Sequence, residues 1–190
     1  MRYGGEMNPV NRIARDRCCG VIVDVQEFFL AQVDKRLRSR LITNIGNLAR
    51  LLDYFQIPLT VTLERPLAVK GSLPKEIGRH LGGRARRFEK DFFDISKDKK
   101  IRDHLADLKR PQVIVAGCET DVCILQSCLG LIALGYEVFV MAELIFSSAR
   151  DTDAAVERMK TAGAVFVTYK TLYYELVEAV QGEPRTDKMF

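Results

Sequence analysis

Short apolar runs alternate along this chain with longer segments in which apolar residues recur at helical spacing. The first pattern predicts buried strands, and the second predicts amphipathic helices packed against them. Strands are predicted over residues 18–24, 58–63, 86–90, 112–117, 136–141 and 164–169. Helices are predicted over residues 37–55, 98–108, 121–134, 151–162 and 171–180. Gly135 and Gly163 follow two of these helices as expected C-caps, and Thr171 is the expected N-cap of the last helix.

Strands that are separated in this way by helices predict a parallel sheet, because parallel neighbours need a crossover connection. The nearly continuous apolar character of the strands indicates that helices cover both faces of the sheet. The expected fold class is α/β, a three-layer α/β/α Rossmann-like fold with a six-stranded, mostly parallel sheet. A length of 190 residues suits one domain over residues 1–190, with a core at about residues 18–180 and a polar tail from residue 181.

Residues 64–87 interrupt the alternation, since they are rich in proline, glycine and basic residues. Irregular segments of this length inside a compact domain are usually lids or contact surfaces. A plain solvated basic loop fits the same composition, so both interpretations of this segment stay open.

Composition and charge remove several classes of function. The net charge of +4 is small and its basic residues are scattered, which does not favour a nucleic-acid partner. No window approaches the ~18 apolar residues that cross a bilayer, and the first 17 residues lack the apolar core of a signal peptide, so we expect a cytoplasmic protein without a membrane partner. The five cysteines have no paired spacing and neither of the two histidines is near one, so neither a disulfide framework nor a zinc site is expected.

Cys123 is the residue that most strongly indicates chemistry. It follows the apolar run of residues 112–116 and a glycine, at the start of a predicted helix. Ligands of open α/β folds bind at the edge formed by the carboxyl ends of the strands, which is where this position falls. The positive end of a helix dipole favours a thiolate, so the position predicts a nucleophile.

Two more ionisable residues end strands at the same predicted edge. Asp24 closes the first strand and Lys90 closes the third, so both can meet Cys123 although they are far apart in sequence. A carboxylate that accepts the thiol proton and an ammonium that stabilises both anions form a workable set for acyl transfer. Taken singly, each residue also has a structural explanation, as a turn cap, a surface charge or a buried thiol.

The three segments that carry these residues resemble, in order and spacing, the motifs of the isochorismatase-like cysteine hydrolases. The segments are Val-Ile-Val-Asp-Val-Gln at 21–26, Phe-Glu-Lys-Asp-Phe-Phe at 88–93, and Gly-Cys-Glu-Thr-Asp-Val-Cys-Ile at 117–124. The resemblance covers about residues 18–180 and is closest to the isochorismatase-domain-containing hydrolases of unknown substrate. The superfamily also includes nicotinamidases, N-carbamoylsarcosine amidases and isochorismatase itself.

The resemblance implies a role for each matching position. Cys123 is implied as the nucleophile, Asp24 as the general base and later acid, and Lys90 as the residue that holds Asp24. A cis peptide bond is implied between Cys118 and Glu119, and the backbone amides of Glu119 and Cys123 are implied as the oxyanion hole. The Glu119 side chain either enters the pocket or makes a structural hydrogen bond.

The implied function is that of a metal-independent cysteine hydrolase that cleaves a small amide or related C–N bond through a thioester. The Asp-x-His metal motif of nicotinamidases is missing from residues 60–66, so no metal and no cofactor are expected. Phe28 and Phe29 are expected to line the pocket for a small-molecule substrate, and the resemblance implies a homo-oligomer. A catalytically silent scaffold and a vinyl-ether hydrolase of the isochorismatase type remain as alternatives.

Overall fold

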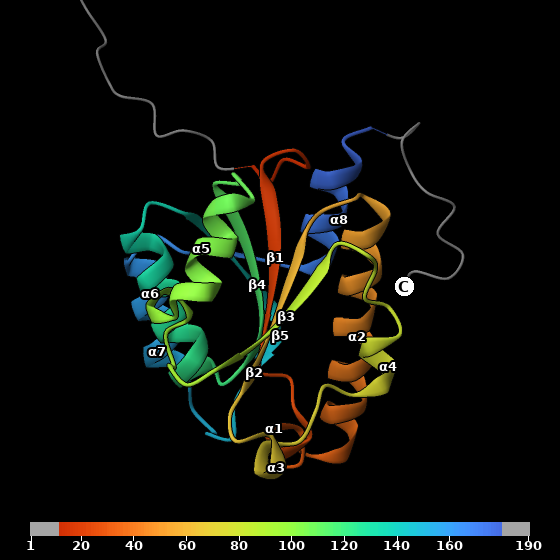
Figure 1. Cartoon of the computed structure of the whole chain (residues 1–190), viewed down its shortest axis with the longest axis vertical. Coiled ribbons are helices and arrows are strands. Elements are labelled where there is room, and N and C mark those ends of the chain that lie inside the picture. The colour runs from red at the N-terminus through yellow and green to blue at the C-terminus, as the bar shows by residue number, and fades with distance from the viewer. Residues whose placement is uncertain (1–11, 180–190) are drawn as a thin grey trace, which may run out of the picture.

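The computed structural model describes residues 12–179, and the expected polar tail and residue 180 of the last helix lie outside this range. Its centre is one six-stranded sheet in which every strand pairs in parallel with its neighbours, which confirms the predicted fold class. The spatial order of the strands is β3-β2-β1-β4-β5-β6 (Figure 1). Their bounds are β1 Cys18–Val23, β2 Leu59–Glu64, β3 Ala85–Lys90, β4 Gln112–Cys118, β5 Glu137–Phe146 and β6 Val165–Val167.

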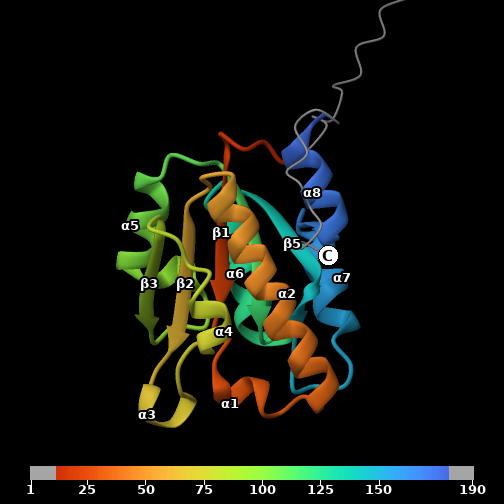
Figure 2. The same cartoon turned by 90° about the vertical axis from the view of Figure 1, so that its right-hand side faces the viewer.

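Helices cover both faces of the sheet. Helices α2, α4 and α8 lie on one face and α5, α6 and α7 on the other, while the short α1 and α3 lie at the carboxyl ends of the strands (Figures 1 and 2). The bounds are α1 Glu27–Leu30, α2 Lys35–Tyr54, α3 Leu67–Lys70, α4 Lys75–Gly78, α5 Lys99–Asp107, α6 Leu125–Ala133, α7 Asp153–Thr161 and α8 Tyr169–Val177.

The strands are buried on both sides because their residues alternate between two apolar clusters. Ile22 of β1 packs in the cluster beneath α2 and α8, whereas Val21 and Val23 pack in the cluster beneath α5, α6 and α7. Successive side chains of a strand point to opposite faces, so an uninterrupted apolar run is needed to fill both clusters.

Several predicted bounds and element types differ from the structure. Strand β5 continues to Phe146 rather than ending at 141, because its register with β4 shifts after Val115 and the pairing resumes beyond the irregularity. A π-helical turn over Thr120–Ile124 precedes α6, where a regular helix was predicted. The last helix begins earlier, because Thr168 rather than Thr171 supplies the N-cap oxygen. Residues 64–87 hold the end of β2 and the short helices α3 and α4.

The sheet reverses its winding between β1 and β4, and Gly117 lets these two strands end close together. Its φ is +121°, and a Cβ atom there would lie 2.0 Å from the carbonyl oxygen of Val23. Such a conformation and such an approach are open only to glycine. In open α/β sheets this reversal point opens the crevice in which ligands bind.

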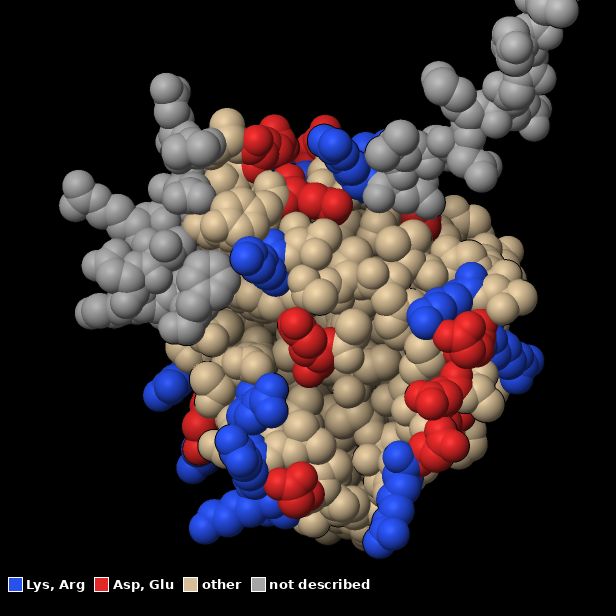
Figure 3. All heavy atoms as spheres, turned by 180° about the vertical axis from the view of Figure 1, so that it is seen from behind, with Lys and Arg blue, Asp and Glu red and all other residues tan. Residues whose placement is uncertain are grey.

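The face turned away from the viewer of Figure 1 carries its acidic and basic side chains mostly along the margins, around a wide area with few charges (Figure 3). Within residues 12–179, no helix combines the length and the apolar character needed to cross a membrane.

Candidate active site

Asp24 is held at the reversal point of the sheet by two partners. It follows β1 with a φ of +52°, so the chain turns and the carboxyl group stays at the carboxyl edge of the strand. The Thr62 hydroxyl donates to Oδ1 at 2.8 Å, and the Lys90 ammonium lies 2.6 Å from Oδ2. Both members of this ion pair are completely buried.

Cys123 lies next to the same ammonium. Lys90 Nζ donates to Cys123 Sγ at 3.5 Å, and the thiol in turn donates to Glu64 Oε2 at 3.4 Å. The sulfur is almost fully covered, since only 2% of Cys123 is exposed. The structure therefore brings Asp24, Lys90 and Cys123 together from the ends of β1, β3 and β4, with Lys90 between the other two.

Glu64 is a site residue that the sequence interpretation missed. It is the last residue of β2 and is paired in register with Lys90 of β3, so its carboxylate joins the same cluster, 3.7 Å from Lys90 Nζ. Gln26 fixes its backbone from both sides, accepting from the Glu64 amide at 2.7 Å and donating to the Glu64 carbonyl at 3.1 Å. The available signal was its position at a strand end, one residue beyond the predicted boundary.

Lys70 of α3 covers Glu64 from outside. Its ammonium lies 3.1 Å from Glu64 Oε1 and stacks over two rings, 4.3 Å from the centroid of Phe28 and 4.7 Å from that of Phe29. Phe28 is exposed, whereas Phe29 is buried in the core beneath α2. The aromatic pair that was expected to line a pocket therefore supports the cation that lies over the acidic side of the site.

Burial dominates the protonation of the site. It raises the pKa of the Cys123 thiol, against the opposing effect of the Lys90 charge. It likewise raises the pKa of Asp24, with Lys90 acting in the opposite direction. Burial alone lowers the pKa of Lys90, but the charges of Asp24 and Cys123 outweigh it and the pKa is raised. The expected lowering of the Cys123 pKa by a helix start is not seen, because the thiol is buried in a π-helical turn and burial raises its pKa.

The segment before the nucleophile is fixed by Cys118 and Glu119, whose peptide bond is cis. The Cys118 thiol is buried and donates to the Asp24 carbonyl at 3.0 Å, and it forms no disulfide. The Glu119 carboxylate accepts from the Ser148 amide at 2.9 Å. Of the two alternatives for this side chain, the structure has the structural hydrogen bond.

Donor atoms of Asp24, Glu64 and Cys123 all lie within 4.8 Å of one another, a spacing that a metal ion could use. The Lys90 ammonium, however, already contacts each of these three groups, at 2.6, 3.7 and 3.5 Å respectively. A cation at this point would compete with a buried positive charge, so the donor set does not favour a resident metal.

Comparisons with known proteins identify the family and similar folds. The family model for the isochorismatase domain matches residues 18–171. "Isochorismatase family protein 1A" of Dictyostelium discoideum is 28% identical over 138 residues, and the match spans 65% of this chain and 66% of that protein. The chain thus spans about two thirds of the length of this relative.

Two solved structures have closely similar folds. The MAR1 ribonuclease from Caenorhabditis elegans has a TM-score of 0.81 at 26% identity, over 89% of this chain and 85% of that chain. The YcaC gene product from Escherichia coli, an octameric hydrolase of unknown specificity, has a TM-score of 0.86 at 23% identity, over 93% and 87% of the two chains. The match of the domain model to most of the sequence shows that the chain belongs to the isochorismatase family.

Proposed function

We propose that this protein is a metal-independent cysteine hydrolase that cleaves a small amide or related C–N bond. One observation carries the proposal: a single buried ammonium, that of Lys90, contacts the Asp24 carboxylate at 2.6 Å and the Cys123 sulfur at 3.5 Å. A scaffold that only binds ligands has no need for this arrangement, because burying ionisable groups together costs stability and such clusters are typical of functional sites.

The first step is acylation of the thiol. As Cys123 Sγ attacks the carbonyl carbon, its proton passes to Asp24, whose raised pKa makes it a stronger base. The Lys90 charge offsets the negative charge that then develops on sulfur. The backbone amides of Glu119 and Cys123 are assigned to the oxyanion, and the loss of one such donor typically slows a reaction about 10²–10³-fold.

Collapse of the tetrahedral intermediate breaks the C–N bond. Asp24 returns the proton to the departing nitrogen, which leaves as an amine or ammonia, and the acyl group remains on Cys123 as a thioester. In the second step Asp24 removes a proton from water, the resulting oxygen nucleophile attacks the thioester, and the thiol is regenerated as the acid leaves.

Glu64 adds a requirement for the substrate. Its carboxylate lies 3.4 Å from the nucleophilic sulfur and contacts Lys70 at 3.1 Å and Lys90 at 3.7 Å, so a negatively charged group next to the scissile bond would have to compete with it for these cations. A neutral amide or carbamoyl group can instead donate an N–H to this carboxylate. We therefore assign an uncharged, N–H-bearing reactive group to the substrate.

We also propose that the protein acts as a homo-oligomer on a small molecule. The similar fold of the octameric YcaC protein supports this, as does the weakly charged area in Figure 3, because the cores of interfaces are depleted in charged residues. Light scattering on the purified chain tests this assignment directly, and a monomer at all concentrations would refute it.

The chemistry is tested with variants of two buried cysteines. A panel of small primary amides and carbamoyl amines is incubated with the wild type and with the variants Cys123→Ala and Cys128→Ala, and ammonia release is measured. We expect turnover of at least one compound, its loss in Cys123→Ala and its retention in Cys128→Ala. Intact-mass spectrometry should show an acyl adduct on the wild type and on Cys128→Ala, and none on Cys123→Ala. Full activity of a folded Cys123→Ala variant refutes the proposal.

A further inference from the structure

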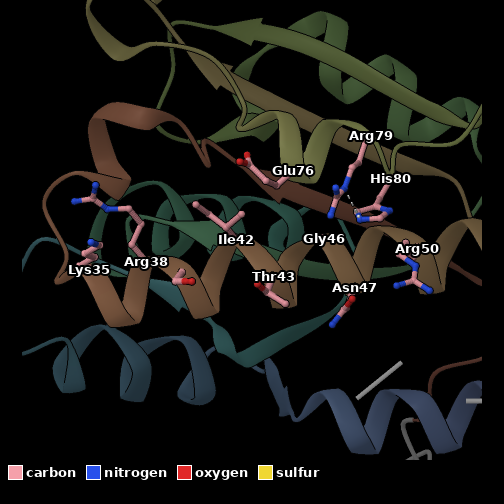
Figure 4. A pocket seen from close by; sticks show the side chains of 11 residues that line it. Lys35, Arg38, Ile42, Thr43, Gly46, Asn47, Arg50, Glu76, Arg79 and His80 are labelled. Atoms are coloured by element: carbon pink, nitrogen blue, oxygen red, sulfur yellow. Dashed lines mark hydrogen bonds between the residues drawn. The ribbon is translucent and has the colours of Figure 1, made fainter. Parts of the chain in front are cut away.

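A cavity lies away from the catalytic cluster, between helices α2 and α4. It has a volume of about 570 Å³, which is in the range of small-molecule sites, and neither Asp24, Lys90 nor Cys123 lines it. In Figure 4, Arg50, Arg79 and His80 lie at one end of this cavity, and Lys35 and Arg38 lie at the other. No role in the proposed hydrolysis accounts for it.

The cavity carries an excess of positive charge. Four cationic side chains line it, against the single carboxylate of Glu76. Within residues 12–179, none of the four forms an ion pair with a carboxylate. Arg38 already donates to two loop carbonyls, at 3.1 and 3.4 Å, so the end that holds Arg50 and Arg79 has the greater capacity to bind an anion.

The structure seats a neutral imidazole between these cations. His80 Nε2 accepts from Arg79 Nε at 3.2 Å, which leaves the ring proton on Nδ1. Burial lowers the pKa of His80, and the charges of Arg79 and Arg50 lower it further. The ring lies against Gly46 in the middle of α2, where a Cβ atom would be 3.2 Å from His80 Cδ2. An interior glycine costs a helix about 0.5–1 kcal/mol relative to alanine, so room for this ring has a cost in stability.

A smaller cavity of about 360 Å³ adjoins the first, and Arg50, Arg79 and His80 line both. The second cavity adds the exposed ring of Tyr54 and the side chain of Leu81, together with the carboxylate of Asp53. The place where the two cavities meet, at Arg50, Arg79 and His80, is called the junction. It combines guanidinium groups with the neighbouring aromatic ring of Tyr54.

We propose that this junction binds a small phosphorylated metabolite, with its phosphoryl oxygens on Arg50 and Arg79 and its uncharged remainder toward Tyr54. Guanidinium groups form two parallel hydrogen bonds to phosphate oxygens, which a single ammonium does not. His80 contributes the proton on Nδ1 and gains a second proton once the anion offsets the two arginine charges. A cavity of this volume fits a small molecule, whereas a polymer would need a longer track of cations.

The two histidines of the chain allow a direct test. The imidazole proton resonances of the full chain are followed by NMR while adenosine monophosphate is added at an ionic strength held constant with sodium chloride. We expect saturable shifts of His80 and a rise of its pKa toward the ordinary value. His104 packs on Phe88 of β3, outside both cavities, and should not respond. Inorganic phosphate should act more weakly and adenosine should have no effect.

Matched variants identify the residues that bind. Arg79→Met should weaken binding of adenosine monophosphate at least about tenfold, since a charged hydrogen bond is lost. Arg40→Met removes the same charge from α2 outside both cavities and should leave the affinity unchanged, as should Cys123→Ala. Failure of His80 to saturate, equal weakening by Arg40→Met, or equal binding of adenosine overturns the proposal. Tighter binding of a single-stranded oligoribonucleotide with a steep salt dependence assigns the cavity to nucleic acid and also overturns it.

Discussion

Replacing Lys90 with methionine tests the ion pair on which the proposed chemistry depends. The substitution keeps an unbranched side chain, one atom shorter, but removes the charge 2.6 Å from Asp24, in a place where neither side chain is exposed. The Thr62 hydroxyl would still donate to the Asp24 carboxyl, at 2.8 Å. Removal of one partner of a buried pair typically costs about 3–5 kcal/mol.

Protonation of Asp24 sets an upper limit to the free energy of unfolding that Lys90→Met loses. A carboxyl group with an ordinary pKa of 3.8 can fold in the neutral form at a cost of about 1.4 kcal/mol per pH unit above that value. The loss at pH 7 is therefore at most about 4 kcal/mol, and at pH 5 at most about 1.6 kcal/mol. The sign follows from proton uptake: in the variant the folded state holds a proton on Asp24 that the unfolded state has released. The free energy of unfolding of the variant, relative to the wild type, thus falls as pH rises from 4 to 7.

Urea unfolding followed by far-UV circular dichroism measures this, since the chain contains no tryptophan. Lys100→Met, at an exposed position of α5, is the control and should change stability little at any pH. Adding Asp24→Asn to Lys90→Met should remove the pH dependence. A loss of stability in Lys90→Met that is the same at pH 5 and pH 7, or that the second substitution leaves unchanged, refutes the buried pair.

Three further predictions concern the site and the fold around it. Glu64 should make the Cys123 thiol discriminate against anions, so the wild type should react faster with iodoacetamide than with iodoacetate, and Glu64→Gln should reduce this rate ratio at least about tenfold. Glu89→Gln, at an exposed position, is the control, and an unchanged rate ratio in Glu64→Gln contradicts the assignment. Gly117→Ala should prevent stable folding, measured as loss of soluble protein or of the thermal transition, because a Cβ would lie 2.0 Å from the Val23 carbonyl oxygen; a variant of wild-type stability would disprove this close approach. Thr168→Ala should lower the free energy of unfolding by about 1 kcal/mol through loss of the α8 cap, whereas Thr171→Ala should have a smaller effect, and the reverse order would restore the cap predicted from the sequence.

The sequence pattern was sufficient to predict the fold, because the apolar runs and the segments with helical spacing are both clear. Apolar runs that fill two clusters can only be central strands of a sheet covered on both faces, and the positions of Asp24 and Cys123 at strand ends follow from this. The meeting of Lys90 with these two residues was predictable for the same reason, since the carboxyl ends of parallel strands share one edge.

Other features depend on tertiary contacts that periodicity does not encode. Glu64 was assigned to a loop because proline and glycine follow it closely, although β2 extends to include it. The raised pKa of the Cys123 thiol follows from its burial, which the local sequence around it does not reveal. The extension of β5 to Phe146 arises from an irregular register with β4, which likewise has no local signature.

The position of β3 at the outer margin of the sheet has a consequence for how the protein loses activity. Lys90 is the last residue of this strand, which pairs with β2 alone among the strands described, whereas Asp24 and Cys123 follow central strands. Outer strands detach at a lower free energy than the global transition. Mild heat or denaturant should thus move Lys90 away from Asp24 and Cys123 while most of the molecule is still folded. The protein should then lose its activity before it unfolds globally.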